Sequence, residues 1–211
     1  MMVTVACVEV RDYLGRGAEY VERLRSMVAR HLIGQPHRFV CLTDAPARHG
    51  GLPAESIHAL PTCDKLAQLL TGWWAKLYLF EPGRFSGRVL YLDLDTLIVG
   101  PLEPVVAQTG AVKLLDWGWD RDVTAGGHLV WDAGEHAEVW AGAELAPKRY
   151  ADDQEYLTAL GGWNRLPPAL LRSYRYHCKS GPPAGCSVVA FHGRPKPHEL
   201  GPDHWVTRAW R

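Results

Sequence analysis

The sequence predicts an α/β fold in which helices flank a Rossmann-like mixed sheet with mostly parallel strands. Strand and helix patterns alternate through the first half of the chain, and two aspartates follow the most regular of the strand patterns. Such alternation favours a parallel sheet, because each crossover helix returns the chain to the same end of the sheet. Ligands of these sheets bind beyond the carboxyl ends of the strands, so we expect the site there.

The first half contains patterns for four strands and two helices. Apolar residues at helical spacing predict a helix over 18–32, and a second, very apolar helix over 65–80 ends before a Pro-Gly pair. Strands are predicted by short runs of β-branched, aromatic and other apolar residues over 3–8, 38–42, 56–60 and 89–93. The resulting order of strand, helix, strand, strand, helix and strand suits a parallel sheet.

The second half is less regular. A short helix is predicted over 152–160, where acidic residues suit the first helical turn. A Pro- and Gly-rich segment over 180–185 predicts a loop. Further strands are predicted over 111–115, 128–131 and 187–191.

The composition fits one globular domain over residues 1–211. Hydrophobic residues make up 47% of the chain and charged residues 22%, which excludes a disordered protein. Lys+Arg and Asp+Glu are equal at 23 each, so no basic excess indicates nucleic-acid binding. Five scattered cysteines, no signal peptide and no long apolar run predict a cytoplasmic protein without a transmembrane segment. The Trp- and Arg-containing segment 204–211 leaves peripheral membrane contact as an alternative to packing on the domain.

Two carboxylates stand at the end of the predicted strand 89–93. Asp93 and Asp95 are separated by one residue, so in a strand they share a face. Burying unpaired charge is costly, so a positive group must lie beside them. Carboxylate oxygens suit Mg²⁺ or Mn²⁺, which makes a divalent cation one candidate. The alternative is a strand end at which Asp95 caps a turn.

Four short motifs follow one another along the chain. They are Trp74-Ala75-Lys76-Leu77-Tyr78, Asp93-Leu94-Asp95-Thr96-Leu97, Asp153-Gln154 and Phe191-His192-Gly193-Arg194-Pro195-Lys196-Pro197. In this order they resemble the GT-A glycosyltransferases, and most closely glycosyltransferase family 8, which includes glycogenin and bacterial galactosyltransferases. The resemblance covers most of the chain.

The resemblance implies the GT-A (nucleotide-diphospho-sugar transferase) fold, with a nucleotide-binding half over 1–95 and a sugar and acceptor half over 96–211. It implies a metal-dependent hexosyltransferase that takes a sugar from a nucleotide-sugar donor, UDP-linked, and transfers it with retention of configuration. The acceptor stays open between a glycan, a lipid-linked sugar, a protein and a small molecule. By the resemblance, Asp93, Asp95 and His192 bind the metal, and a histidine nitrogen favours Mn²⁺ over Mg²⁺.

The resemblance gives five further residues a place around the donor. Lys196 neutralises the diphosphate as a point charge, and Arg194 can share that role. Lys76 reaches the donor sugar or the phosphate. Asp153 and Gln154 lie beside the anomeric carbon. The alternatives are a solvated lysine for Lys196, a snorkelling lysine for Lys76 and helix capping for the Asp-Gln pair.

Two residues near the ends of the first two strands are candidates for binding the base. By the resemblance, Tyr13 stacks on uracil, and Asp44 lies in a loop near the base. The alternatives are a tyrosine that covers a helix start and an ordinary turn aspartate. Asp93 is also a candidate for contacting the ribose.

The chain departs from the family at two points. The segment from His192 to Lys196 is one residue shorter than usual, and segment 124–128 has glycines where the family has a sugar-contacting Asn. Two other functions therefore stay open. A nucleotidyltransferase of related fold would need a Gly-rich N-terminal loop, which residues 9–12 lack. A non-catalytic module that binds nucleotide sugars or glycans is the second alternative.

Overall fold

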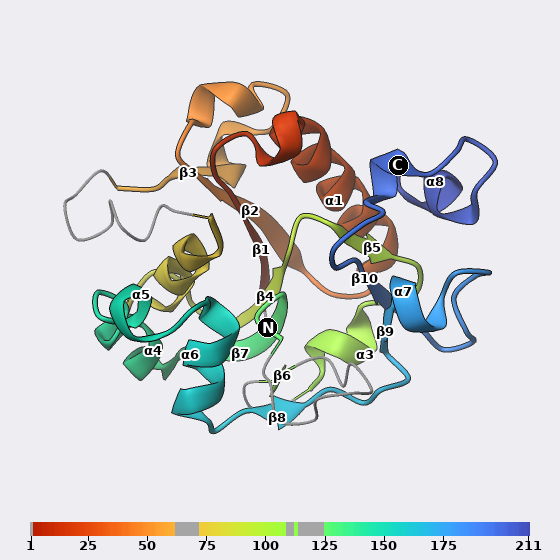
Figure 1. Cartoon of the computed structure of the whole chain (residues 1–211). Coiled ribbons are helices and arrows are strands. Elements are labelled where there is room, and N and C mark those ends of the chain that lie inside the picture. The colour runs from red at the N-terminus through yellow and green to blue at the C-terminus, as the bar shows by residue number, and fades with distance from the viewer. Residues whose placement is uncertain (1, 62–71, 109–111, 114–124) are drawn as a thin grey trace.

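The computed structural model describes residues 2–61, 72–108, 112–113 and 125–211. Its centre is a seven-stranded sheet (Figure 1). The strands lie in the order β3 (Ile57–Ala59), β2 (His37–Thr43), β1 (Val3–Glu9), β4 (Arg88–Leu92), β7 (His128–His136), β6 (Val112–Lys113) and β8 (Asn164–Arg165). The strands from β3 to β4 run parallel to one another, β7 is antiparallel to its neighbours β4 and β6, and β6 is parallel to β8. The predicted α/β fold with a mostly parallel mixed sheet is confirmed.

A second sheet of three strands joins distant parts of the chain. Strand β10 (Val188–Ala190) lies between β5 (Thr96–Ile98), to which it is antiparallel, and β9 (Leu171–Ser173), to which it is parallel. Strand β5 begins directly after Asp95, and β10 leads into Phe191 and His192. This pairing therefore carries the late motif to the same region as the two acids.

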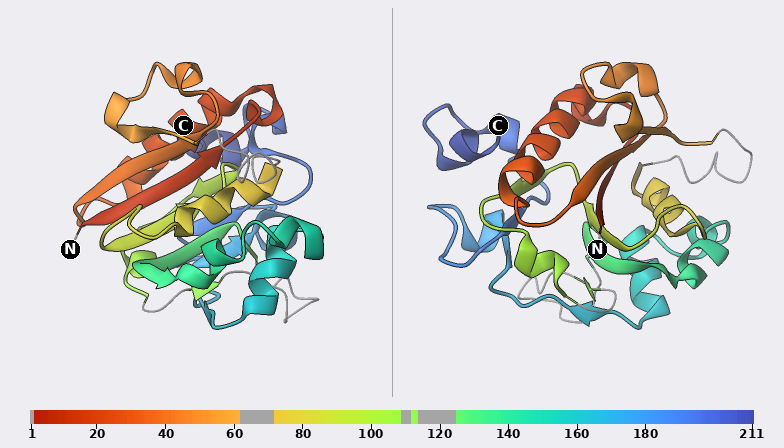
Figure 2. Two further views of the ribbon diagram at one scale, coloured as in Figure 1. Left: turned by 90° about the vertical axis from the view of Figure 1, so that its left-hand side faces the viewer. Right: turned by 180° about the vertical axis from the view of Figure 1, so that it is seen from behind.

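Helices and loops cover both faces of the central sheet. Alternate strand residues enter two separate cores, because successive side chains point to opposite faces: Val5 and Leu90 belong to one core, and Ala6 and Tyr91 to the other. Figure 2 shows the two sides, with α1 and α8 on one and α4 to α6 on the other. The helices are α1 (Gly17–His31), α3 (Glu103–Val106), α4 (Ala137–Ala141), α5 (Ala146–Arg149), α6 (Asp153–Leu160), α7 (Tyr174–His177), α8 (Trp205–Ala209), and the 3₁₀ helices η1 (Tyr13–Gly15), η2 (Pro46–His49), η3 (Ala54–Ser56), η4 (Gly72–Phe80) and η5 (Pro197–Glu199).

The predicted strands and helices of the first half lie within one or two residues of the observed ones, with one difference in type. The helix predicted over 65–80 is a 3₁₀ helix over its described part, η4, and residues 62–71 lie outside the described residues. The strand predicted over 89–93 ends at Leu92. Asp93 and Asp95 therefore lie in a turn between β4 and β5, so the expectation that they share a strand face is wrong.

In the second half, α6, β7, β10 and the loop over 180–185 are confirmed, whereas β5, β8, β9 and the short helices were not expected. Only 112–113 of the strand predicted over 111–115 lies within the described residues. No helix in the described part of the chain is long and apolar enough to cross a membrane.

Candidate functional site

A cavity of about 490 Å³ lies beyond the carboxyl ends of β1 and β4. It draws its walls from both halves of the chain, because η4, the β4–β5 turn, the start of α6 and the segment after β10 all reach it. Its lining includes eight of the residues that the sequence singles out, namely Tyr13, Lys76, Asp93, Asp95, Asp153, Gln154, His192 and Lys196.

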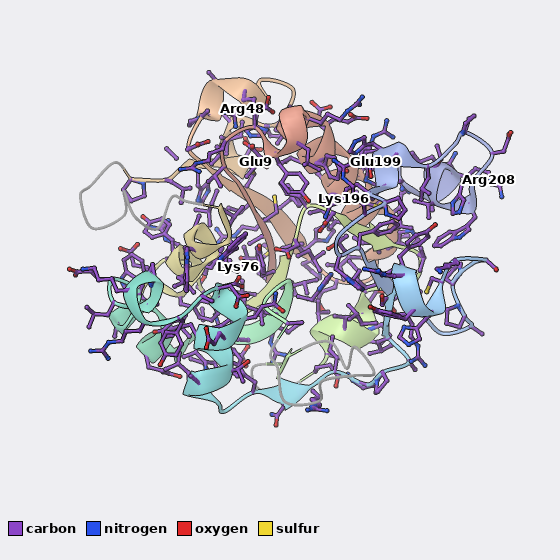
Figure 3. All side chains as sticks on the ribbon, viewed as in Figure 1. Glu9, Arg48, Lys76, Lys196, Glu199 and Arg208 are labelled. Carbon is purple, nitrogen blue, oxygen red and sulfur yellow. The ribbon has the colours of Figure 1, made fainter. Side chains whose placement is uncertain are left out.

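Lys76 is a buried cation at the floor of this cavity, and Figure 3 labels it. Its side chain extends from η4, and its Nζ lies 3.0 Å from Asp153 Oδ2, 3.4 Å from Asp93 Oδ1 and 3.2 Å from the Gly126 carbonyl oxygen. Burial lowers the pKa of Lys76, but the two carboxylates raise it by more, so the pKa lies above its ordinary value. The lysine therefore stays charged, and it is only 5% exposed.

The two acids that face Lys76 differ in their pKa. Burial raises the pKa of Asp93, but Lys76 and a hydrogen bond from the Tyr91 hydroxyl outweigh burial and hold it below the ordinary range. Burial dominates for Asp153 and raises its pKa, although Lys76 acts against it. Within the described residues, Asp153 Oδ2 has an ion pair with Lys76 but no well-aligned hydrogen bond.

Two glycines allow these carboxylates to approach the start of β7. A Cβ at Gly126 would overlap Asp153 Oδ2, and a Cβ at Gly127 would overlap Asp93 Oδ2. The backbone also fixes the turn, because Asp93 N donates to Gly127 O at 2.8 Å. The glycines that replace the family's asparagine segment are thus required by the packing of the site's own acids.

Asp95 faces the other side of the cavity and has its own cation. The Lys196 ammonium forms an ion pair with Asp95 Oδ2, and the Tyr13 hydroxyl donates to the same oxygen at 3.1 Å. Burial raises the pKa of Asp95 above its ordinary value, with Lys196 acting against it. The alternative that Asp95 merely caps a turn is therefore incomplete, because its side chain contacts residues far away in the sequence.

His192 lines the same cavity but is held by other partners. Its Nε2 lies 2.7 Å from Ser173 Oγ, and its ring stacks on Tyr176. Burial, with Arg175 and Lys196 nearby, lowers the pKa of His192 to about 4. The imidazole is therefore neutral at pH 7, which is the form that can bind a metal.

The residues predicted to bind a metal do not converge as they are arranged here. Within the described part of the chain, no three His, Cys, Asp or Glu side chains are placed so that they could hold an ion together. Asp93 and Asp95 each face a lysine instead. Lys196 and Tyr13 both contact Oδ2 of Asp95, so at this oxygen a metal ion would compete with the Lys196 ammonium.

Asp44 and Arg194 are not among the residues that line the cavity. Asp44 Oδ2 accepts from Arg11 N at 3.0 Å, and its other oxygen lies 3.5 Å from Arg48. The Arg194 side chain is 75% exposed and forms an ion pair with Glu199. Their roles in binding the base and the diphosphate stay predictions.

Sequence reasoning missed two members of the site. Tyr91 donates to Asp93, but Asp93 lies in the turn after β4, so the alternation of side chains along the strand did not reveal the contact. Trp73 also lines the cavity. The helical pattern did not reveal it, because Trp73 and Trp74 are equally apolar and only the fold decides which is exposed.

Solved structures resemble the whole chain. The galactosyltransferase LgtC in complex with donor and acceptor sugar analogues has a TM-score of 0.69 at 17% identity, and the match covers 99% of this chain and 93% of LgtC. An active-site mutant of LgtC gives the same TM-score and coverage at 16% identity. The apo form of the glycosyltransferase GlyE of Streptococcus pneumoniae TIGR4 has a TM-score of 0.69 at 13% identity, and the match covers 100% of this chain and 59% of GlyE.

The chain has the GT-A fold. The resemblance seen in the sequence is thus confirmed at the level of the fold, and at these identities the likeness shows the fold alone. Neither a protein-family model nor a curated protein matches the sequence. The activity of this GT-A chain must therefore be argued from its own site.

Proposed function

We propose that the protein is a glycosyltransferase that moves a sugar from a nucleotide-sugar donor, UDP-linked, to an acceptor with retention of configuration. The observation that carries the proposal is the charged floor of the cavity, where buried Lys76 lies between Asp93 and Asp153 beyond the carboxyl end of β4. Such a preorganised cluster in a cleft is costly to build and is typical of a functional site. The LgtC and GlyE structures support the proposal through the shared fold.

The residues of the cavity suit the parts of such a donor. Lys76 and Lys196 supply the positive charge that a diphosphate needs as negative charge develops on the leaving nucleotide. Asp153 and Gln154, at the start of α6, offer a carboxylate and an amide to sugar hydroxyls. Tyr13, in the 3₁₀ helix η1 that follows β1, presents an aromatic ring to the base. The nucleotide half (1–95) and the sugar half (96–211) are part of this proposal.

The metal is a separate element of the proposal. Asp93, Asp95 and His192 are the ligand types that Mn²⁺ accepts, with Mg²⁺ as the alternative, and such an ion supplies charge stabilisation of a leaving diphosphate. Support comes from their shared cavity and from the neutral His192. Because Lys196 pairs with Asp95, we expect the variant Lys196→Met to bind Mn²⁺ more tightly than the wild type when no nucleotide is present, and to bind UDP less tightly.

A donor screen tests the function. The protein is incubated with nucleotide sugars, with and without Mn²⁺, and the released nucleoside diphosphate is measured; calorimetry with UDP and with Mn²⁺ runs beside it. We expect UDP binding and slow release of UDP from one UDP-sugar, and about a hundredfold less release in Asp153→Asn. Absence of binding to any nucleoside diphosphate would end the proposal. UDP binding without turnover of any donor would indicate a binding module.

A further inference from the structure

Four free cysteines in the described part of the chain form two contacting pairs. The sheet pair, Cys7 and Cys41, stands side by side on β1 and β2 and is joined by a hydrogen bond between the thiols. The loop pair, Cys178 and Cys186, is joined by a hydrogen bond of the same kind. All four side chains are buried, and Cys186 is the most exposed at 6%. A buried free cysteine can serve merely as a small apolar side chain, so a chemical role needs a further difference between the pairs.

The two pairs differ in the backbone that encloses them. Residues 179–185, which join Cys178 to Cys186, are Pro- and Gly-rich and are exposed except for the partly buried Gly181. This segment lies between α7 and β10 at the edge of the molecule (Figure 1). The backbone hydrogen bonds at its two ends, each of 3.2 Å, close only local turns. Local opening of such a segment costs little free energy, whereas access to the sheet pair requires two interior strands to separate.

The two thiols of the loop pair are not equivalent. The hydrogen bond from Cys178 lowers the pKa of Cys186 below its ordinary value, although burial acts in the opposite direction. The same hydrogen bond, together with burial, raises the pKa of Cys178. Because the thiolate is the form that attacks a disulfide, Cys186 is the attacking group of the pair. Cys178 is the neighbouring thiol that can react with the product of that attack.

We propose that Cys178 and Cys186 are a redox modification site, at which a low-molecular-weight disulfide such as oxidised glutathione converts the two thiols to an intramolecular disulfide. The Cys186 thiolate attacks one sulfur of the small disulfide, forms a mixed disulfide with it and expels one thiolate. Cys178 then attacks the Cys186 sulfur, and its proton goes to the second small thiolate as this leaves. Two protein thiols are thereby oxidised, and one small disulfide is reduced to two thiols.

The disulfide would join the two segments that hold His192. Ser173 and Tyr176, which contact the His192 ring, lie at the start of α7 and within it, and Cys178 follows the last residue of this helix. Cys186 lies two residues before β10, the strand that leads into His192. Oxidation therefore restrains one wall of the cavity. The inference does not rest on the proposed function, because neither the modification nor its test involves a nucleotide or turnover.

The test exposes the reduced, folded wild type to glutathione buffers with an increasing share of oxidised glutathione. Remaining thiols are then alkylated and the peptides are mapped by mass spectrometry, because Cys63 lies outside the described residues and a thiol count alone would not identify the pair. We expect a cross-link between Cys178 and Cys186 that dithiothreitol reverses. It should form at least about tenfold faster than any modification of the sheet pair, which is the internal control. In urea, where the fold no longer protects either pair, the two pairs should react at similar rates. The proposal is overturned if the loop pair stays reduced as long as the sheet pair, or takes up glutathione without forming the cross-link.

The variants Cys178→Ser and Cys186→Ser test the order of attack. Cys178→Ser should accumulate a stable glutathione adduct on Cys186, because the serine hydroxyl can still donate to that sulfur and no second thiol resolves the adduct. Cys186→Ser should react at least about tenfold more slowly, because burial raises the pKa of its remaining Cys178 thiol. Equal rates in the two variants would contradict the assignment of Cys186 as the attacking thiol.

The melting temperature of the wild type gives a second measurement that needs no variant. The oxidised protein should have a Tm about 5 °C above that of the reduced protein, because the cross-link closes a loop that stays closed in the unfolded chain. A lower Tm after oxidation would show that the disulfide forms only by distorting the fold, and it would overturn the proposal even if the cross-linked peptide were found.

Discussion

Two buried ionic clusters among the described residues have opposite charge arrangements, and Figure 3 labels the central residue of each. In one, the buried base Lys76 lies between the acids Asp93 and Asp153. In the other, the acid Glu9 is 0% exposed and is surrounded by donors. Its two oxygens accept from Tyr13 N, Thr43 Oγ1, Arg48 and His49 Nε2.

The charge balance of the two clusters indicates that Glu9 has a structural role and Lys76 a functional one. Glu9 has its charge balanced by cationic or potentially cationic partners, and it does not line the cavity. The Lys76 cluster has two acids for one base, faces the cavity and leaves Asp153 Oδ2 without a well-aligned hydrogen bond among the described residues. A buried cluster whose charges do not balance indicates a ligand-binding site, whereas a cluster with balanced charges stabilises the fold.

The balanced cluster has a specific structural task. It holds the loop after β1, in which Arg11, Asp12 and Leu14 have positive φ values of 59°, 51° and 56°. Backbone of this kind costs free energy for residues other than glycine, so the surrounding contacts must maintain it. Glu9 accepts from Tyr13 N within this loop at 3.0 Å, and the Tyr13 hydroxyl then reaches Asp95.

The largest effect is expected at Lys76. Lys76→Met removes the charge at the cavity floor while keeping an unbranched side chain, so we expect UDP release from the donor to fall about a thousandfold. Two facing acids are also left without their cation, which should lower the free energy of unfolding by about 3 kcal/mol. The rate of UDP release and urea unfolding measure the two effects. Lys76→Arg keeps the charge, so it should recover much of the lost stability. Activity close to wild type in Lys76→Met would remove the distinction between the clusters.

The next largest effect is a pH dependence of stability, which we expect from a histidine near the Lys76 cluster. His128 is buried behind Asp93, and burial lowers its pKa to about 4. Its Nε2 bonds to Thr96, and its Nδ1 has no hydrogen bond within the described part of the chain, so a proton there would be a buried, unpaired charge. The unfolded chain takes up this proton near pH 6.5, before the folded protein does. Stability contributed by neutral His128 is therefore complete above pH 6.5 and is lost as the pH falls toward 4, by about 3 kcal/mol in total.

The variant His128→Gln isolates this contribution. An amide does not titrate, so the difference in unfolding free energy between pH 7 and pH 4 should be about 3 kcal/mol smaller in the variant than in the wild type. Asp95 and Asp153 have raised pKa values and act in the opposite direction, but they are present in both proteins and cancel. Identical pH profiles would contradict the assignment of His128 as a buried neutral group.

The sequence predicts where the site lies more reliably than how its charges are paired. Asp93 and Asp95 were recognisable because acids interrupt an apolar strand, and the parallel sheet then places them at its carboxyl edge. Glu9 also ends an apolar strand, so no local pattern distinguishes it from them. Its partners Arg48 and His49 come from η2, and Lys196 lies about a hundred residues from Asp95. Tertiary structure decides which charged residues form these ion pairs, and neither secondary-structure propensity nor sequence spacing predicts it.

The exposure of Trp73 escaped the sequence for a related reason. Trp73 and Lys76 are three residues apart, so they lie on one face of either an α-helix or the observed 3₁₀ helix η4. The spacing therefore does not show that Trp73 is exposed at the cavity while Trp74 packs in the core. Tertiary packing decides this.

The smallest effect is expected at Glu9, and it probes the balanced cluster. Glu9→Gln keeps the shape of the side chain but removes the charge that Arg48 and His49 face. We expect the free energy of unfolding to fall by about 2 kcal/mol, because donors are left with a weaker acceptor in a buried place. Urea unfolding measures this loss. Glu19→Gln is the matched control. Glu9 pairs with Arg48 and His49 in the interior, whereas Glu19 pairs with two arginines at the surface, where such pairs contribute less than about 1 kcal/mol.

The activity of Glu9→Gln then tests whether charge balance distinguishes the structural cluster at Glu9 from the functional cluster at Lys76. Glu9 accepts from Tyr13 N, and the Tyr13 hydroxyl reaches Asp95 in the cavity, so UDP affinity should fall a few-fold at most in Glu9→Gln. The loss should disappear when Tyr13→Phe is already present, since the hydroxyl that reaches Asp95 is then gone. A structural role alone would lower stability equally in both backgrounds without this dependence. If Glu9→Gln instead abolished turnover as completely as Lys76→Met, Glu9 would belong to the site, and charge balance would not separate the two clusters.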